Sequence, residues 1–204
     1  MASTTDFINT STSVLAYNAF QLLGILGGYS GEASNPMPYS KFAASSVAKK
    51  GGSKSKMMIP SRMGMLIIYV PATIVAFVFQ CILPVISEDA AAAPTAVAGW
   101  MVLAHFLKRD LEVLFLHKYS GETELNAARL IGLMYALTSF MICLVAVPTP
   151  PTSEELCASI GLFVVGSLGN LYHHYLLAQL RRASSTTSHK KYVAPRGGLF
   201  EYDT

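Results

Sequence analysis

The stretch that decides the fold is Leu156–Arg182, which reads LCASIGLFVVGSLGNLYHHYLLAQLRR. Its part from Leu156 to Leu180 contains no Asp, Glu, Lys or Arg. This apolar run is long enough to cross a bilayer, because about 20 residues of helix span the hydrocarbon core. Two arginines follow at once, as is usual where a span reaches water. The stretch therefore predicts a membrane-spanning helix.

Similar apolar stretches recur along the chain and predict an all-α membrane protein. Hydrophobic residues make up 52% of the 204 residues and charged residues 13%, whereas soluble domains carry about 25% charged residues. We predict a single membrane domain over residues 1–204, a bundle of five transmembrane helices. The spans are expected at about residues 14–28, 63–86, 92–107, 125–147 and 156–180, with a flexible basic loop at 29–62 and a polar C-terminal tail at 183–204.

The positions of the basic residues predict the topology. All 15 lysines and arginines fall in three segments, which lie around the connections after the first and third spans and after the fifth span. Five spans place these segments on one side, and the positive-inside rule makes that side the cytoplasmic, stromal or matrix side. The N-terminus is then outside and the C-terminus inside. Basic residues at membrane boundaries, without a nucleic-acid-reading motif, indicate a lipid bilayer as partner and exclude nucleic acid.

Three polar residues share one stripe of the last apolar segment. On a helix Asn170, His174 and Arg181 lie at offsets of four and seven. They carry an amide, an imidazole and a guanidinium to the basic end, and such groups suit a phosphorylated ligand at a membrane surface. Two other interpretations stay open. Asn170 can join two helices by a hydrogen bond, and Arg181 can be an ordinary boundary arginine.

Several short motifs resemble one known family when they are taken in order. They are PYSKF at 38–42, IPSRMG at 59–64, HFLKRDLEVLFLH at 105–117, NLYHHYLLAQLRR at 170–182 and PRGGLFEY at 195–202. This order resembles the steroid 5α-reductase family and its very-long-chain enoyl-CoA reductase relatives, and the third motif is similar to the enoyl-CoA branch. The resemblance implies seven helices, of which this chain corresponds to the first five and lacks the last two. It also implies the endoplasmic reticulum, with another organelle membrane left open.

The resemblance also implies a chemistry and site residues. The family moves hydride from NADPH to the β-carbon of an α,β-unsaturated carbonyl. Asn170, Arg181 and Tyr192 match its cofactor-contacting positions. Where the steroid branch has a catalytic glutamate, two residues before a proline, this chain has Tyr69, and the family's tyrosine partner is Phe106 here. Tyr69 is the remaining candidate proton donor, since an aimed phenol is a competent acid; the alternative that the residues favour is a helix-packing tyrosine.

These departures predict a degenerate or truncated member of the family. We expect NADPH to bind weakly or not at all, and the chain alone to be inactive as a reductase. The favoured role is a non-catalytic structural or assembly subunit of a membrane complex that contains other subunits. The alternative is a fragment of an active reductase of α,β-unsaturated lipid carbonyls.

No metal site is predicted. Adjacent His173 and His174 point about 100° apart on a helix and cannot easily bind one ion together. Lys108 and Glu112 are expected to pair at i,i+4 on a wet helix face. Two further sets are expected to serve packing: the cysteines inside packed spans and the glycines where helices approach closely. These are Cys81, Cys143 and Cys157, and Gly132, Gly161, Gly166 and Gly169.

Overall fold

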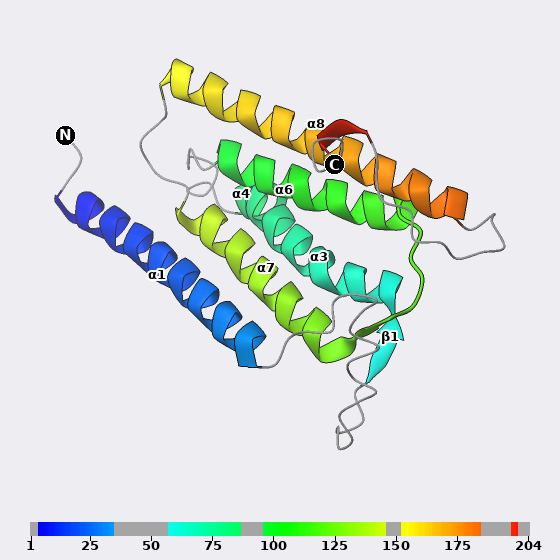
Figure 1. The fold of residues 1–204 in the computed structure, drawn as a ribbon. Helices are drawn as coiled ribbons and strands as arrows, with labels where there is room; N and C mark the ends of the chain where they lie inside the picture. The colour runs from blue at the N-terminus through cyan, green and yellow to red at the C-terminus, as the bar shows by residue number, and fades with distance from the viewer. Residues whose placement is uncertain (1–3, 35–56, 87–95, 146–151, 185–196, 200–204) are drawn as a thin grey trace.

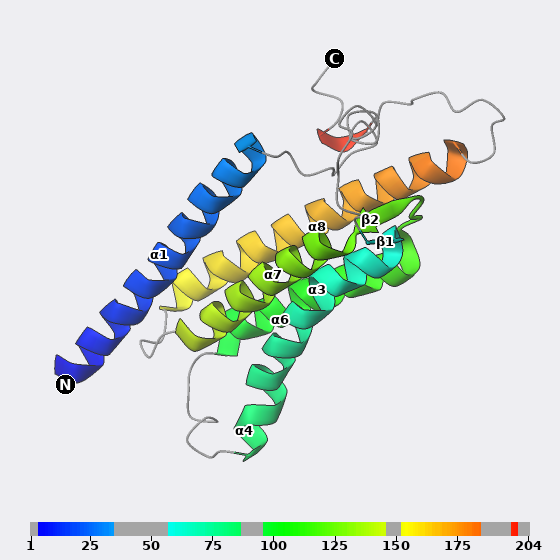
Figure 2. The same cartoon turned by 90° about the horizontal axis from the view of Figure 1, so that it is seen from below.

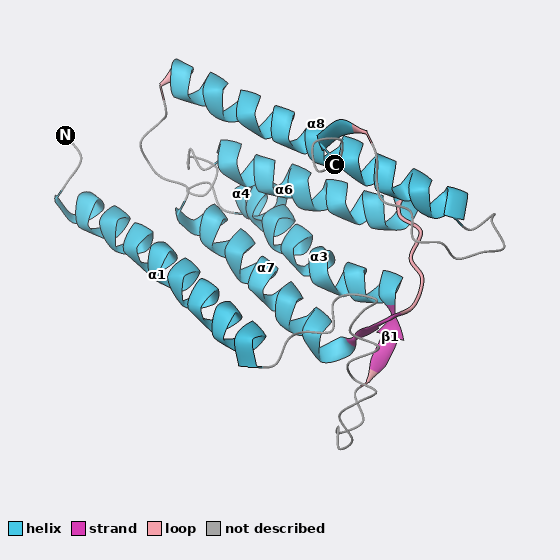
Figure 3. Cartoon of the chain, in the orientation of Figure 1, coloured by secondary structure: helices cyan, strands magenta, loops and turns pink. Residues whose placement is uncertain are grey.

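The described part of the chain is built almost entirely of helices (Figures 1 and 3). The computed structural model describes residues 4–34, 57–86, 96–145, 152–184 and 197–199. Its elements, in chain order, are α1 (Thr4–Ser34), β1 (Met58–Pro60), α3 (Ser61–Phe77), the π-helical turn η1 (Val78–Ile82), α4 (Leu83–Ile86), α6 (Ala96–Leu111), the π-helical turn η2 (Glu112–Leu116), β2 (Glu122–Glu124), α7 (Leu125–Val145) and α8 (Ser153–Ser184).

The core lies where α3 packs against α7 and α6 (Figure 1). Small residues allow α3 and α7 to approach closely: Ala72 and Ala128 are fully buried, and a Cβ at Gly132 would collide with the backbone carbonyl oxygen of Ile67. The Ser139 hydroxyl donates to the carbonyl of Ala72 at 3.0 Å. Close packing of small residues, with a hydroxyl bond across the interface, is the usual way in which membrane helices associate.

Three of the helical segments are long and apolar enough to cross a membrane. They are Ser61–Val85, Leu125–Cys143 and Ser153–Arg182. They agree with three of the five predicted spans, those at 63–86, 125–147 and 156–180. The predicted span at 14–28 lies inside α1, and the described part of the span at 92–107 lies inside α6. For these two helices, membrane crossing stays a prediction, as does the orientation of the termini.

A short ribbon ties the beginning of α3 to the beginning of α7. Strands β1 and β2 pair antiparallel, with Met58 opposite Glu124 and Pro60 opposite Glu122. Part of the predicted loop at 29–62 is therefore structured, because α1 continues to Ser34 and 58–60 form a strand; residues 35–56 lie outside the described part. The predicted tail likewise begins as the end of α8. Residues 197–199 form a turn (Figure 2). This turn contacts α8, because the Leu199 N–H donates to Nε2 of His173 at 3.0 Å.

Helix α8 lies alongside α6 and contacts η2 (Figure 1). The apolar side chains of its first half are largely exposed, Leu162 at 76% and Val165 at 72%, as suits a surface that faces lipid. Of the four glycines expected at close helix contacts, Gly132 is at one. Gly161, Gly166 and Gly169 have no atom of the described residues within 4 Å of an added Cβ, so that expectation is wrong for α8. The bonds that tie α8 to α6 are polar and come from its second half.

Candidate functional site

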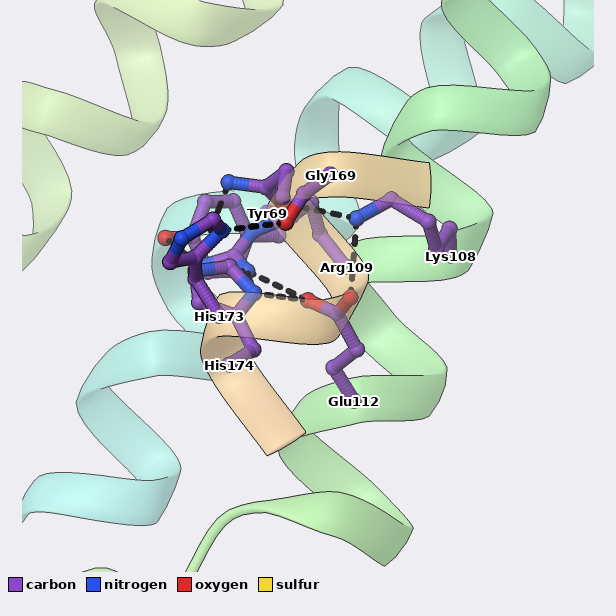
Figure 4. A network of polar contacts seen from close by, with 8 residues as sticks. Tyr69, Lys108, Arg109, Glu112, Gly169, His173 and His174 are labelled. Carbon is purple, nitrogen blue, oxygen red and sulfur yellow. Dashed lines mark hydrogen bonds and ion pairs between the residues drawn. The ribbon is translucent and has the colours of Figure 1, made fainter. Parts of the chain in front are cut away.

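A buried carboxylate, Glu112, is the centre of a polar network between α3, α6 and α8 (Figure 4). Its side chain is only 3% exposed. Oε1 accepts a hydrogen bond from Nζ of Lys108 at 2.8 Å, and Oε2 is bonded by Nη1 of Arg109 and lies 2.9 Å from Nδ1 of His174. Burial by itself raises the pKa of Glu112, but the bonds from Lys108 and His174 and the charge of Arg109 outweigh it, so the pKa is lowered. Glu112 is therefore held as an anion.

Arg109 connects the three helices. From α6, its Nη2 donates to the hydroxyl of Tyr69 on α3 at 2.7 Å, and its Nη1 lies 2.7 Å from Nδ1 of His174 on α8. The guanidinium carbon also lies 4.7 Å from the centre of the Tyr69 ring, within cation–π range. Glu112 is a further partner of this guanidinium. Among the described residues, Arg109 therefore contacts side chains from α3, η2 and α8.

Tyr69 is a packing residue, which is one of the two roles considered for it; its role as a proton donor stays a prediction. Its side chain is buried, at 8% exposure, and its ring stacks on Tyr135 with centroids 5.9 Å apart. Phe106, at the position of the family's tyrosine, packs against Tyr135, with ring centroids 5.7 Å apart. The Tyr69 hydroxyl accepts from Arg109 and keeps its own hydrogen for donation. Tyr69 is thus a packing residue that also holds an aimed hydroxyl.

The residues proposed for cofactor binding are used in different ways. Asn170 joins α8 to α6, because its Oδ1 accepts from Nζ of Lys108 at 2.8 Å. Its Nδ2 lies 3.5 Å from Nε2 of His174, so the predicted stripe brings these two side chains together. Arg181, about two turns farther on, donates instead to the backbone carbonyl of Lys118 at 3.1 Å. Tyr192 lies outside the described residues.

The expected pair on a wet face is formed but is not wet. Lys108 and Glu112 make the predicted i,i+4 ion pair at 2.8 Å, yet their side chains are only 19% and 3% exposed. The reason is that α8 covers this face of α6 through His174 and Asn170. Glu112 also opens the π-helical turn η2, and such turns are frequent at functional sites. The sequence did carry a signal here: four charged residues, Lys108, Arg109, Asp110 and Glu112, lie within an otherwise apolar run.

Glu112, His117 and His174 are close enough to suggest a cation site. One donor atom from each lies within 4.8 Å of the others, and two imidazoles with one carboxylate can hold a transition metal. Nη1 of Arg109, however, contacts both Glu112 and His174, so the guanidinium supplies the positive charge at this point. Burial, His174 and Arg109 together lower the pKa of His117 to about 4. The arrangement fits an arginine-centred network better than a metal ion.

The two cations of the network, Lys108 and Arg109, are already paired and are not free for the pyrophosphate of a nicotinamide dinucleotide. A pyrophosphate needs several cationic or N–H donors, but Lys108 and Arg109 are paired with Glu112. The groove beside the network is apolar, between η2 and α8, and is lined by Leu116, Leu168, Leu171, Tyr172 and Tyr175. Such a lining suits a hydrocarbon chain and offers a phosphate no charge.

Comparison with known proteins gives a partial match. No family model matches the chain. The chain is 30% identical over 102 residues to a very-long-chain enoyl-CoA reductase of Dictyostelium discoideum, which covers 48% of this chain and 33% of that protein. It is 32% identical over 108 residues to a probable very-long-chain enoyl-CoA reductase of Caenorhabditis elegans, covering 48% and 34%. The chain thus matches about a third of the length of these curated relatives. The similarity supports the enoyl-CoA reductase branch of the resemblance.

Proposed function

We propose that this chain is a relative of the enoyl-CoA reductases that serves a membrane complex as a non-catalytic helical subunit. The observation that carries the proposal is that the two cations of its polar network are already paired inside the protein. Lys108 and Arg109, whose side chains are 19% and 11% exposed, are both paired with Glu112. Arg109 and Asn170 also fasten α6 to its neighbours. The network therefore acts as a clamp between helices.

The energies favour a clamp over a phosphate site. To bind a phosphate, Lys108 or Arg109 would have to leave Glu112, which is 3% exposed. Breaking a buried ion pair by removing one partner costs about 3–5 kcal/mol. A charge-assisted hydrogen bond returns only about 1.5–3 kcal/mol. The described helices alone are therefore expected to bind NADPH no more tightly than about millimolar, which corresponds to about −4 kcal/mol.

Calorimetric titration of the purified chain with NADPH in lipid nanodiscs tests this role. Wild type should show no binding tighter than millimolar, and no NADPH oxidation with a 2-enoyl-CoA. Glu112→Gln releases Lys108 and Arg109 and should bind NADPH more tightly than wild type, provided that circular dichroism shows it folded. Arg181→Ala is the matched control outside the network. Micromolar binding by wild type that is lost in Arg181→Ala would overturn the proposal.

The complex itself provides the second test. Native purification of the tagged chain from its own membranes should recover other membrane subunits in fixed ratio. Deletion of the gene should lower the abundance of those subunits, and no enoyl-CoA should accumulate. We propose the endoplasmic reticulum as the location, on the basis of the family resemblance. Co-localisation with markers of this and other organelle membranes checks it.

A second role has one observation in its favour, the position of the Tyr69 hydroxyl. Arg109 holds this hydroxyl at 2.7 Å, as a proton donor to an enolate oxygen requires. In this role the chain is part of an active reductase of α,β-unsaturated lipid carbonyls. Protein purified from native membranes would then oxidise NADPH with an enoyl-CoA. Tyr69→Phe would lower turnover by about 10²–10⁴-fold, while Tyr135→Phe would leave it near wild type.

A further inference from the structure

A second buried carboxyl, Asp110, lies two residues before Glu112 in an opposite environment. Its side chain is 8% exposed. Oδ2 lies 2.5 Å from the Thr73 hydroxyl on α3, and Oδ1 is buried without a hydrogen-bond partner among the described residues. Consecutive helical residues turn by about 100°, so residues two apart point to nearly opposite sides. Asp110 therefore faces α3, away from the cations that surround Glu112.

The carboxyl groups of Glu112 and Asp110 differ in the side chains that contact them. Glu112 is contacted by Lys108, Arg109 and His174. In the described part of the chain, Asp110 has a single neutral hydroxyl. A buried carboxylate without a cation is costly, because it gives up hydration without an opposite charge in return. Two carboxyl groups whose environments differ in this way are expected to differ in protonation.

Counting hydrogens at Thr73 leads to the same result. Its Oγ1 lies 2.5 Å from Oδ2 of Asp110 and 3.3 Å from the backbone carbonyl oxygen of Tyr69. A hydroxyl has one hydrogen and can donate it to only one of them. If Asp110 is ionised, one of these two acceptor oxygens receives no hydrogen bond from Thr73. If Asp110 is protonated, it donates to Thr73, and Thr73 donates to Tyr69, so both contacts become hydrogen bonds.

We propose that Asp110 is a neutral carboxylic acid at neutral pH, and that it fastens α6 to α3 through Thr73 at the turn that carries Tyr69. Asp110 is then a positioning residue for Tyr69, and it does not itself need to touch a ligand. Burial, which outweighs the Thr73 bond, raises the pKa of Asp110 and agrees with this assignment. The proposal is independent of whether the network is a clamp or part of a catalytic site.

The surrounding titratable groups do not change this assignment. On α3 the neighbour is Tyr69, whose hydroxyl is bonded to Arg109. On α7, Tyr135 stacks on Tyr69. On α6, Arg109 and Glu112 are bonded to each other, as is Lys108 to Glu112. No hydrogen bond or ion pair joins any of these described groups to Asp110.

The sign of the pH dependence follows. An acid whose pKa is higher in the folded state keeps its proton there at pH values at which the unfolded chain has lost it. The contribution of Asp110 to stability is therefore full at low pH and is lost as the pH rises from the unfolded value through the folded pKa. Deprotonation places an unpaired charge between α3 and α6, and should loosen their contact.

Infrared difference spectroscopy of the full chain in nanodiscs tests the protonation state. Subtracting the spectrum of Asp110→Asn from that of wild type at neutral pH should show the loss of one protonated-carboxyl C=O stretching band. Glu122→Gln, at an exposed position of β2, is the matched control and should show the loss of carboxylate bands instead. Loss of carboxylate bands alone in Asp110→Asn would overturn the proposal.

Thermal unfolding gives an independent readout. Asn keeps the shape of the neutral acid and can donate its amide hydrogen to Thr73. Asp110→Asn should therefore unfold at or above the wild-type midpoint and should remove the alkaline part of the pH dependence. Asp110→Ala should unfold at a lower midpoint at every pH. If Asp110→Asn lowers the midpoint as much as Asp110→Ala does, an ionised Asp110 is required and the proposal is wrong.

Discussion

Arg109 touches Tyr69 twice: Nη2 donates to the tyrosine hydroxyl at 2.7 Å, and the guanidinium carbon lies 4.7 Å from the centre of the same ring. The two contacts fix both the position and the plane of the guanidinium. They join α6 to α3 inside the bundle, where a buried charge left without a partner is costly. Glu112 bonds the other edge of Arg109 and is itself bonded by Nδ1 of His174, so the position of α8 depends on this network too.

Glu112→Gln should be the most destabilising conservative change in the network. It leaves Lys108 and Arg109, whose side chains are 19% and 11% exposed, without their counter-charge. Breaking a buried pair in this way costs about 3–5 kcal/mol. Chemical unfolding in detergent micelles measures the loss. Glu122→Gln, exposed on β2, should change the free energy of unfolding by less than about 0.5 kcal/mol; equal losses in the two variants would contradict a buried ion pair.

Tyr69→Phe should cost less, because the ring and its stacking on Tyr135 remain. The variant removes the hydroxyl that accepts from Arg109. A hydrogen bond to a charged group contributes about 1.5–3 kcal/mol, and a loss in that range is expected in the same unfolding measurement. Tyr135→Phe, in which the stacked ring also stays, is the control. A Tyr69→Phe variant as stable as wild type would mean that Arg109 does not depend on the hydroxyl.

The lowered pKa of His117 predicts that the protein loses stability in mild acid. Its pKa falls from 6.5 to about 4 on folding, through burial first and then the charges of His174 and Arg109. The unfolded chain therefore binds the proton more readily than the folded one. The contribution of neutral His117 to the free energy of unfolding is complete above pH 6.5 and is lost as the pH falls toward about 4. Midpoints of unfolding across this window should decline for wild type and decline less for His117→Gln; parallel curves would show that His117 is not the group responsible.

Gly132 and Gly161 make a matched pair for the role of close packing. A methyl group at Gly132 would collide with the carbonyl oxygen of Ile67, while at Gly161 it meets no described atom within 4 Å. Gly132→Ala should destabilise by about 1–3 kcal/mol through overpacking. Gly161→Ala should stabilise by about 0.5–1 kcal/mol, since alanine is the better helix former. Equal effects in the two variants would show that α3 and α7 are not in close contact at Gly132.

The topology predicted from the basic residues is open to direct mapping. Five spans place Lys54 and Lys190 on the same, cytoplasmic side and the N-terminus on the other. Single cysteines can be placed at positions 54 and 190 in a background without the three natural cysteines. Both should react with an impermeant thiol reagent that is added on the cytoplasmic side. Neither should react with reagent added on the other side until the vesicles are opened. Labelling of positions 54 and 190 from opposite sides would exclude five spans.

The polar stripe of the last span could be found from the sequence in part. The spacing of Asn170 and His174 predicted two neighbours on one helix face, and they are neighbours in the structure. The partners of Asn170 and His174 could not be predicted from the sequence, because Lys108 and Arg109 are more than sixty residues away in the chain. Arg181 shares the spacing but binds the backbone of Lys118, since the ligand of a boundary arginine depends on which loop lies nearby.

The sequence by itself determined the helices and the three segments that are long and apolar enough to cross a membrane, because apolar length and the absence of charge are local properties that act on each segment separately. Only the tertiary structure decided which charges are buried. Glu112 and Asp110 are two residues apart on the same helix end, yet one faces cations from α6 and an imidazole from α8, and the other faces a hydroxyl from α3. Protonation and ion pairing are set by what is packed against a side chain, and segments distant in sequence supply those neighbours.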